Sequence, residues 1–213
     1  MAMIRTVAAR AVARLIAGFA RLVTGVVGDW RGCPPALNQR VYFANHSSHG
    51  DFVLIWTVLS VRARRQTRPV AAADYWNVPG LRRFIGAHVF NALLIDRKAG
   101  GGSAIAAMAD ALTQGDSLII FPEGTRNTGT TPLLPLRPGI HHLARAWPAV
   151  EFVPVWIDNI ARVMPKGELL PVPLLCSVIF GEPIALAPDE TREEFLRRAS
   201  QALLQLKPGE EPS

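Results

Sequence analysis

The chain has 213 residues, of which 49% are hydrophobic and 19% charged, and its formal charge is +6. These values fit one globular domain with a full core. The sequence contains no visible internal repeat or low-complexity block. Twenty of the 23 basic residues are arginine, whose planar guanidinium suits phosphate-bearing partners. Nucleic acid, anionic lipid and an acidic carrier protein all fit the charge alone. The two cysteines, Cys33 and Cys176, form neither a metal-binding spacing nor a disulfide framework.

Residues 1–28 are predicted to form an amphipathic helix that associates with a membrane surface. Apolar side chains recur with helical spacing, while Arg10, Arg14 and Arg21 gather on the opposite face. These arginines leave uncharged pieces of six or seven residues, against about 20 needed to cross a bilayer. The interruptions also argue against a cleaved signal peptide. A helix packed on the domain is the alternative, but the polar face has no acidic residue, which favours an anionic membrane surface.

From residue 29 to 207 the predicted elements alternate between strand and helix. Short apolar runs predict six strands, at residues 41–44, 69–73, 92–95, 117–121, 152–157 and 174–180. Helical patterns fall at residues 52–61, after Pro79, and at 103–112, 139–147 and 191–206. This alternation predicts an α/β domain with a largely parallel central sheet wrapped by helices. Residues 208–213 form a polar tail.

Four local features carry more specific expectations. Thr191–Glu194 reads as a capping box that opens the last helix. Ser103 is expected to cap its helix. Residues 62–68, with four arginines, are expected to form a basic loop. Pro154 lacks an amide hydrogen, so its strand is expected to lie at an edge or to bend.

His46 and Asp51 form the first candidate site. His46 follows a strand and Asp51 lies five residues on, near the start of a helix. The two side chains meet if His46 sits in the loop and Asp51 in the first helical turn. The carboxylate would then orient the imidazole and stabilise the cation that forms when the ring takes a proton. The alternative is a buried histidine satisfied by a neighbouring carboxylate. His49 is interpreted as a helix-start or surface residue.

A glycine-containing turn, Phe121–Arg126, follows the predicted strand at 117–121. Ligands of α/β proteins usually bind at the carboxyl edge of the sheet, where this turn would lie. Gly124 lets the backbone approach an anion, Thr125 offers a hydroxyl, and Arg126 offers a fork for phosphate. Glu123 could pair with Arg126, orient it or bind a glycerol hydroxyl. Arg97, at the end of another strand, could supply a second cationic arm.

These segments resemble the glycerolipid and lysophospholipid acyltransferase superfamily, typified by 1-acylglycerol-3-phosphate acyltransferase. The family's NHxxxxD motif stands here as Asn45–Asp51. Its arginine-terminated second block stands as Leu94–Arg97, its FPEGTR motif as Phe121–Arg126, and its VPV-type strand as Val153–Val155. All four occur in family order within residues 40–160. Some relatives carry a two-helix membrane motif before the first block, whereas only one helix fits here.

The resemblance implies a direct acyl transfer. His46 would deprotonate the free hydroxyl of a lysophospholipid, most simply 1-acylglycerol-3-phosphate, and Asp51 would hold His46. The hydroxyl would attack an acyl thioester supplied by acyl-CoA or acyl carrier protein, with no acyl-enzyme, metal or other cofactor. The acceptor's phosphate end would be bound by Glu123, Gly124, Thr125 and Arg126, together with Arg97. The expected location is peripheral or monotopic on the cytoplasmic face of the inner membrane, with no nucleic-acid partner.

Other functions remain open from the sequence. The acceptor could be another lysophospholipid, glycerol-3-phosphate or a lyso-aminolipid, since Asp74 stands where many relatives have lysine. A thioester hydrolase could use His46 and Asp51 to activate water. A non-enzymatic membrane-surface protein would explain the basic helix but would not need that pair. Condensation-type acyltransferases place histidine and aspartate closer together and are about twice as long.

Overall fold

A seven-stranded sheet forms the middle of the computed structural model, which describes residues 2–96, 100–158 and 176–209. The strands run across the sheet in the order β1-β7-β6-β2-β5-β3-β4. Among them, only the β6–β7 pair is antiparallel. Their bounds are β1 (Val27–Trp30), β2 (Arg40–Ala44), β3 (Thr67–Ala72), β4 (Leu93–Ile95), β5 (Ser117–Ile120), β6 (Glu151–Asp158) and β7 (Ser177–Phe180).

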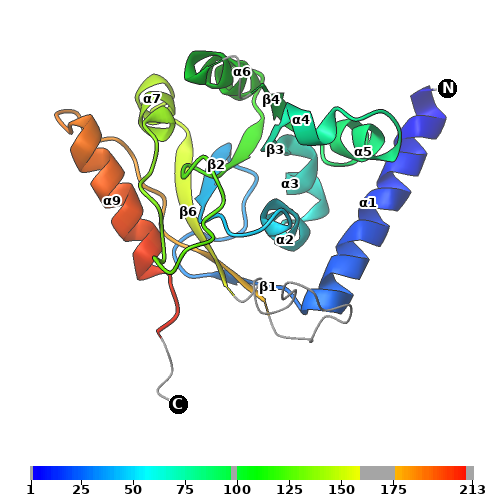
Figure 1. The fold of residues 1–213 in the computed structure, drawn as a ribbon, viewed down its shortest axis with the longest axis horizontal. Helices are drawn as coiled ribbons and strands as arrows, with labels where there is room; N and C mark the ends of the chain where they lie inside the picture. Colours follow the sequence, from blue (N-terminus) through cyan, green and yellow to red (C-terminus); the bar gives the residue numbers. More distant parts are fainter. Residues whose placement is uncertain (1, 97–99, 159–175, 210–213) are drawn as a thin grey trace.

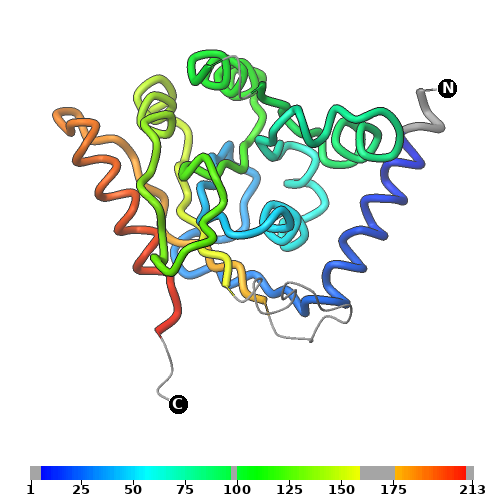
Figure 2. Tube along the Cα trace, viewed as in Figure 1, coloured from blue at the N-terminus to red at the C-terminus, as the bar shows by residue number. Residues whose placement is uncertain are grey.

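Helices cover both faces of the sheet, and Figures 1 and 2 show α1 and α9 on opposite sides of the molecule. One group consists of α1 (Ala2–Thr24), α2 (Asp51–Val58), α3 (Val61–Gln66), α4 (Ala73–Trp76), α5 (Leu81–Phe84) and the π-helical turn η1 (Ile85–Val89). The other consists of α6 (Gly101–Thr113), α7 (Gly139–Ala146) and α9 (Arg192–Gln205). The α/β fold with a mostly parallel sheet and an N-terminal helix is confirmed. None of the helices within the described residues is long and apolar enough to span a bilayer.

The sheet separates two hydrophobic cores. Alternate residues of a strand point to opposite faces, so Tyr42 and Ala44 of β2 pack with α1 and α2. Val41 and Phe43 pack instead with α6, α7 and α9. All five residues of β2 and all four of β5 are buried, as expected for parallel strands covered on both faces.

The structure corrects two expectations for the first half of the chain. The N-terminal helix, predicted to reach residue 28, ends at Thr24. Val27–Trp30 instead forms β1, which pairs with β7, although its glycine and aspartate do not favour a strand. The segment 62–68 is not a loop. Ser60 caps α3 by accepting a hydrogen bond from the Ala63 amide at 3.2 Å, and the chain then enters β3.

Two expectations from the second half also change, while a third is confirmed. β6 lies between β7 and β2, so the edge position expected from Pro154 is wrong, while the alternative of a bend stays a prediction. The Pro154 carbonyl accepts a hydrogen bond from the Gly181 amide at 3.0 Å, just past the end of β7. The nitrogen of Pro154, which carries no hydrogen, faces the same side, where the pairing of β6 with β7 has already ended. Ser103 lies inside α6, which begins at Gly101 without a side-chain cap. The capping box at Thr191 is present.

Candidate active site

The two candidate segments meet at the carboxyl edge of the sheet. β2 and β5 are neighbours and parallel, so the chain leaves both strands at the same edge. β2 leads into the loop that carries His46, and β5 leads into the glycine turn that contains Gly124. The amide of Asn127, next to Arg126, donates a hydrogen bond to the His46 carbonyl at 2.6 Å. The turn therefore lies directly against the histidine loop.

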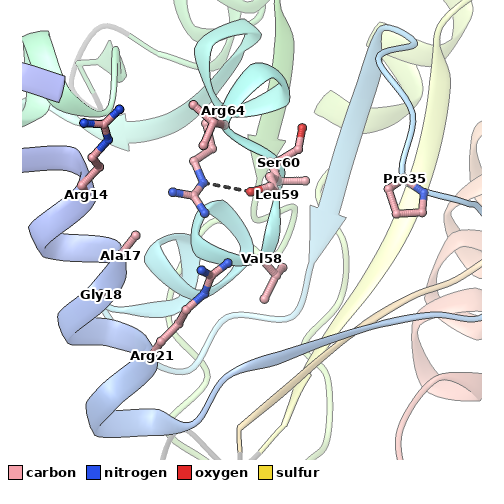
Figure 3. A pocket seen from close by; sticks show the side chains of 10 residues that line it. Arg14, Ala17, Gly18, Arg21, Pro35, Val58, Leu59, Ser60 and Arg64 are labelled. Atoms are coloured by element: carbon pink, nitrogen blue, oxygen red, sulfur yellow. Dashed lines mark hydrogen bonds between the residues drawn. The ribbon is translucent and has the colours of Figure 1, made fainter.

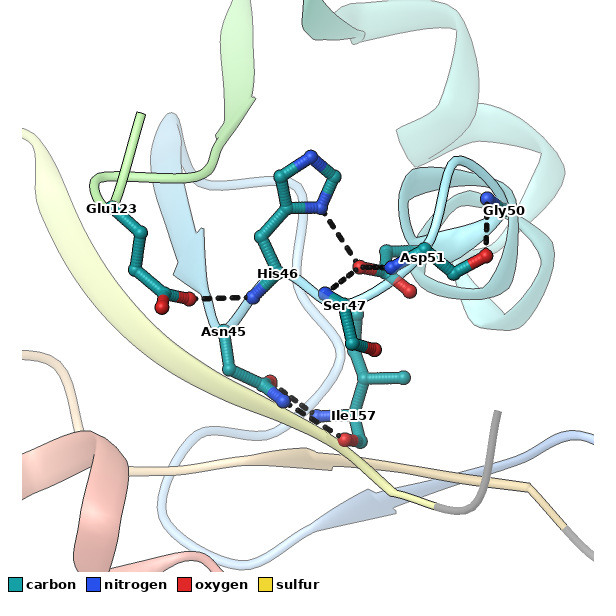
Figure 4. A network of polar contacts seen from close by, with 8 residues as sticks. Asn45, His46, Ser47, Gly50, Asp51, Glu123 and Ile157 are labelled. Atoms are coloured by element: carbon teal, nitrogen blue, oxygen red, sulfur yellow. Dashed lines mark hydrogen bonds and ion pairs between the residues drawn. The ribbon is translucent and has the colours of Figure 1, made fainter. Parts of the chain in front are cut away.

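The His46 ring is held by Asp51, the first residue of α2. Nδ1 of His46 lies 2.8 Å from Oδ2 of Asp51. The other ring nitrogen points away from the carboxylate, as Figure 4 shows. The imidazole is 17% exposed, whereas Asp51 is fully buried. The predicted contact between a loop histidine and a carboxylate in the first helical turn is present, and part of the imidazole stays exposed.

The Asp51 carboxylate also organises the loop around it. Oδ2 accepts backbone hydrogen bonds from Ser47 at 2.7 Å and Ser48 at 2.9 Å, in addition to the contact with His46. The second oxygen, Oδ1, is buried and has no hydrogen-bond partner among the described residues. All three donors converge on one oxygen, which fixes the rotamer of the carboxylate and hence the direction of the imidazole.

Glu123 joins the glycine turn to the histidine loop. Its Oε1 accepts from the His46 amide at 2.7 Å, and its Oε2 accepts from the Leu134 amide at 2.8 Å. Burial raises the pKa of Glu123, against the opposing effect of these two amide hydrogen bonds. Phe121, from the same turn, stacks on the His46 ring with centroids 4.2 Å apart. Glu123 is 3% exposed, so among the contacts described here it acts on the backbone rather than on Arg126.

Asn45 anchors the loop to the other neighbour of β2. Its side-chain amide donates to the Ile157 carbonyl at 3.0 Å, and its oxygen accepts from the Ile157 amide at 2.8 Å. This reciprocal pair links the end of β2 to β6, immediately before the histidine (Figure 4). Sequence reasoning gave Asn45 no role beyond the motif, because the partner lies 112 residues away.

The turn itself combines a close backbone approach with exposed polar side chains. Gly124 has φ of +70°, and a Cβ at that position would overlap the side chain of Arg137. Arg137 donates from Nε to the Glu123 carbonyl at 3.3 Å. Thr125 and Arg126 are exposed. Arg137 was not among the predicted site residues. It follows Leu136 in a stretch without a distinctive pattern, and only its packing on Gly124 reveals it.

Arg97 lies outside the described residues, so its contribution stays a prediction. The His49 ring stacks on Tyr75 with centroids 5.2 Å apart. The described arrangement thus provides an oriented imidazole, an exposed arginine on the adjoining turn, and a rigid backbone that holds the two segments together.

Comparisons with known proteins identify a family and a similar fold. A family model described as Acyltransferase matches residues 35–158, more than half of the chain. Among solved structures, the chain is similar to the crystal structure of the 1-acyl-sn-glycerophosphate acyltransferase PlsC from Thermotoga maritima. That match has a TM-score of 0.69 and 21% identity, and it covers 93% of this chain and 80% of the other. At this identity the likeness shows the fold. The search of curated proteins gave no match.

Proposed function

The chain belongs to the acyltransferase family, in the glycerolipid acyltransferase superfamily, and we propose that it acylates the free hydroxyl of a lysophospholipid. The observation that carries this proposal is the oriented His46 imidazole beside the turn that presents Arg126. A base next to a cationic anion-binding side chain suits an acceptor with a hydroxyl close to a phosphate. The donor is an acyl thioester, of CoA or of acyl carrier protein.

The reaction requires a single base. Because the Asp51 carboxylate accepts the Nδ1 hydrogen, Nε2 of His46 carries a lone pair and faces outward. Nε2 takes the proton of the acceptor hydroxyl as its oxygen attacks the thioester carbonyl carbon. The tetrahedral intermediate expels the thiolate, which receives the proton from His46, leaving an ester and a free thiol. Asp51 stabilises the transient imidazolium. Neither a metal nor an acyl-enzyme takes part in this sequence.

Arg126 is assigned to the acceptor's phosphate, with Gly124 and Thr125 beside it and Arg97 as a second cationic arm. An exposed guanidinium forms charge-assisted, bidentate hydrogen bonds with phosphate oxygens. Glu123 contributes indirectly, because its carboxylate holds both the His46 backbone and the loop at Leu134. We therefore treat Glu123 as a positioning residue of the acceptor site.

The acceptor that we favour is 1-acylglycerol-3-phosphate, which would make phosphatidate the product. This choice draws support from the fold shared with a 1-acyl-sn-glycerophosphate acyltransferase and from the arginine on the turn. Glycerol-3-phosphate, other lysophospholipids and lyso-aminolipids are the alternative acceptors. Thioester hydrolysis and a purely structural role at the membrane are the alternatives outside acyl transfer.

We also propose that α1 docks the enzyme on an anionic membrane, on the cytoplasmic face of the inner membrane. The helix packs small residues, Ala17 and Ala20, on the domain. Three of its large apolar side chains face outward instead, since Leu15 is 71% exposed, Phe19 66% and Leu22 82%, whereas Ile16 and Val23 pack against the core. Exposed apolar side chains next to arginines suit insertion at the headgroup boundary. Deletion of residues 1–27 is a poor test, because it would uncover the core under Ala17.

The decisive assay incubates purified protein and a labelled acyl thioester with 1-acylglycerol-3-phosphate, glycerol-3-phosphate or lysophosphatidylethanolamine. We expect labelled phosphatidate as the main product and no turnover by the His46→Ala variant. Label released mainly as free fatty acid would identify a hydrolase. Arg126→Ala should raise the acceptor KM about 10-fold or more, the loss of one charge-assisted hydrogen bond. The matched control is Arg145→Ala, which removes an exposed arginine from the last turn of α7 and should leave KM unchanged.

Docking is tested by sedimentation with anionic vesicles. The double variant Phe19→Ser/Leu22→Ser should bind at least about 10-fold more weakly, because each full side chain contributes roughly 1.5–3 kcal/mol when buried in apolar surroundings. Leu204→Ser is the control, since Leu204 is 40% exposed on α9, on the other side of the molecule. Equal binding by the two variants would show that another surface carries the membrane contact.

A further inference from the structure

A cavity of ≈ 520 Å³ lies between the N-terminal helix α1 and the junction of α2 with α3. Three arginines line it: Arg14 and Arg21 from α1, and Arg64 from α3. Figure 3 shows Arg21 and Arg64 extending toward one another across the gap. The residues that line the cavity include no aspartate or glutamate. Three arginines therefore line one cavity without a carboxylate in its wall, and the guanidinium groups of Arg21 and Arg64 face one another in it.

Two of the arginines are fixed by the end of α2. Arg21 Nη2 donates to the Thr57 carbonyl at 3.1 Å, and Arg64 donates to the same carbonyl and, from Nε, to the Leu59 carbonyl at 2.9 Å. The last carbonyls of a helix lack partners within the helix, so these contacts stabilise α2. They occupy only part of each guanidinium, which has five N–H donors. Fixed side chains with unused donors form a preorganised anion site.

The charges of the cluster are not balanced within it. Burial lowers the pKa of Arg64, and the nearby charge of Arg21 acts in the same direction. The Arg64 guanidinium also lies over the Trp56 ring, 4.8 Å from its centroid. Two like charges that donate to one carbonyl oxygen repel each other, and a bound anion would relieve that repulsion.

We propose that this cavity binds the phosphate of an anionic phospholipid headgroup. The chemistry selects phosphate because arginine forks match its oxygens. The surroundings select a lipid, because the exposed stripe of Leu15, Phe19 and Leu22 lies on average about 120° round α1 from Arg14 and Arg21. A helix with its apolar stripe in the bilayer then holds these arginines at headgroup level. The inference rests on the proposed membrane docking of α1 and assigns it a specific lipid contact.

The test compares Arg14→Gln with Arg10→Gln. Both substitutions remove one exposed arginine from α1, but only Arg14 lines the cavity. Arg14 has no role in holding α2 among the described contacts, so its loss should leave the fold intact. With phosphatidylglycerol in phosphatidylcholine vesicles, we expect Arg14→Gln to weaken binding at least about 20-fold. Arg10→Gln should weaken it about fivefold, as for one charge near an anionic surface.

Three results would overturn the assignment, and they are distinguishable. If both variants lost the same amount of vesicle affinity, the arginines would act only through general electrostatic attraction to the anionic surface. The docking proposal would then stand, but without a specific headgroup site. A second result would identify a soluble anion as the ligand. In that case inorganic phosphate would protect the free protein against thermal unfolding in an Arg14-dependent way, but it would not compete with vesicles. Failure of the unmodified protein to bind anionic vesicles would refute the membrane docking itself and leave the acyl-transfer assay unaffected.

Discussion

Replacing Asp51 with asparagine isolates the charge of this residue from its geometry. All three hydrogen bonds to the carboxylate converge on Oδ2, from His46 and from the amides of Ser47 and Ser48. If the side-chain NH₂ of the asparagine took the place of Oδ2, it would face two backbone N–H donors and could accept from neither. The side-chain oxygen of the asparagine is therefore expected to occupy that place. The imidazole then keeps its orientation, and the variant loses mainly the negative charge opposite the imidazolium.

The size of the effect follows from Coulomb's law. Opposite charges about 4 Å apart attract by about 4 kcal/mol at an effective dielectric constant of about 20. Since 1.36 kcal/mol corresponds to tenfold in rate, the full charge is equivalent to about a 10³-fold change. Proton transfer is incomplete in the transition state, so we expect kcat to fall about 10²–10³-fold, with the acceptor KM little changed because the Arg126 turn is untouched.

The assay measures steady-state kcat and acceptor KM, together with urea unfolding to verify that the variant is folded. The matched control is Asp116→Asn, which removes a carboxylate paired with Arg68 at 3.2 Å, away from the histidine. It should leave kcat unchanged and cost at most about 1 kcal/mol of stability. A folded Asp51→Asn variant that retains kcat within about threefold would refute the role of the Asp51 charge in catalysis.

Three further substitutions test the supports of the site. Asn45→Asp places a carboxylate oxygen against the Ile157 carbonyl, so it should cost about 3 kcal/mol in urea unfolding, and an unchanged midpoint would contradict the described pairing. In Glu123→Gln, an NH₂ donor replaces one of the two carboxylate oxygens that accept from backbone amides. The substitution should lower the free energy of unfolding by about 1–3 kcal/mol, and kcat should fall at temperatures where the protein is still folded. Burial raises the pKa of Glu151, but hydrogen bonds from Asn38 and Arg40 outweigh burial and hold it below its ordinary value. The ionised form is thus favoured by folding, and this stability is present above the ordinary pKa and lost as pH falls through the lowered one. Glu151→Gln should therefore flatten the decline of stability in acid, and an unaltered acid decline measured by unfolding across pH would refute the linkage.

The sequence by itself determined the elements and the chemistry that are encoded locally. Continuous apolar runs identified β2, β5 and β6, because strands buried on both faces need apolar side chains at nearly every position. The contact of His46 with Asp51 was predictable because the two residues are five positions apart, across a loop and one helical turn. The capping box at Thr191 is equally local.

Only the tertiary structure decided the contacts between distant segments. Glu123 reaches the His46 amide across 77 positions of sequence, and Asn45 reaches Ile157 across 112. The order of strands, which places Pro154 inside the sheet, is also invisible in a local pattern. Apolar residues surround much of α1, so the sequence could not say which of them face the domain. That choice depends on where the core lies, and the core exists only once segments far apart in the chain have packed together.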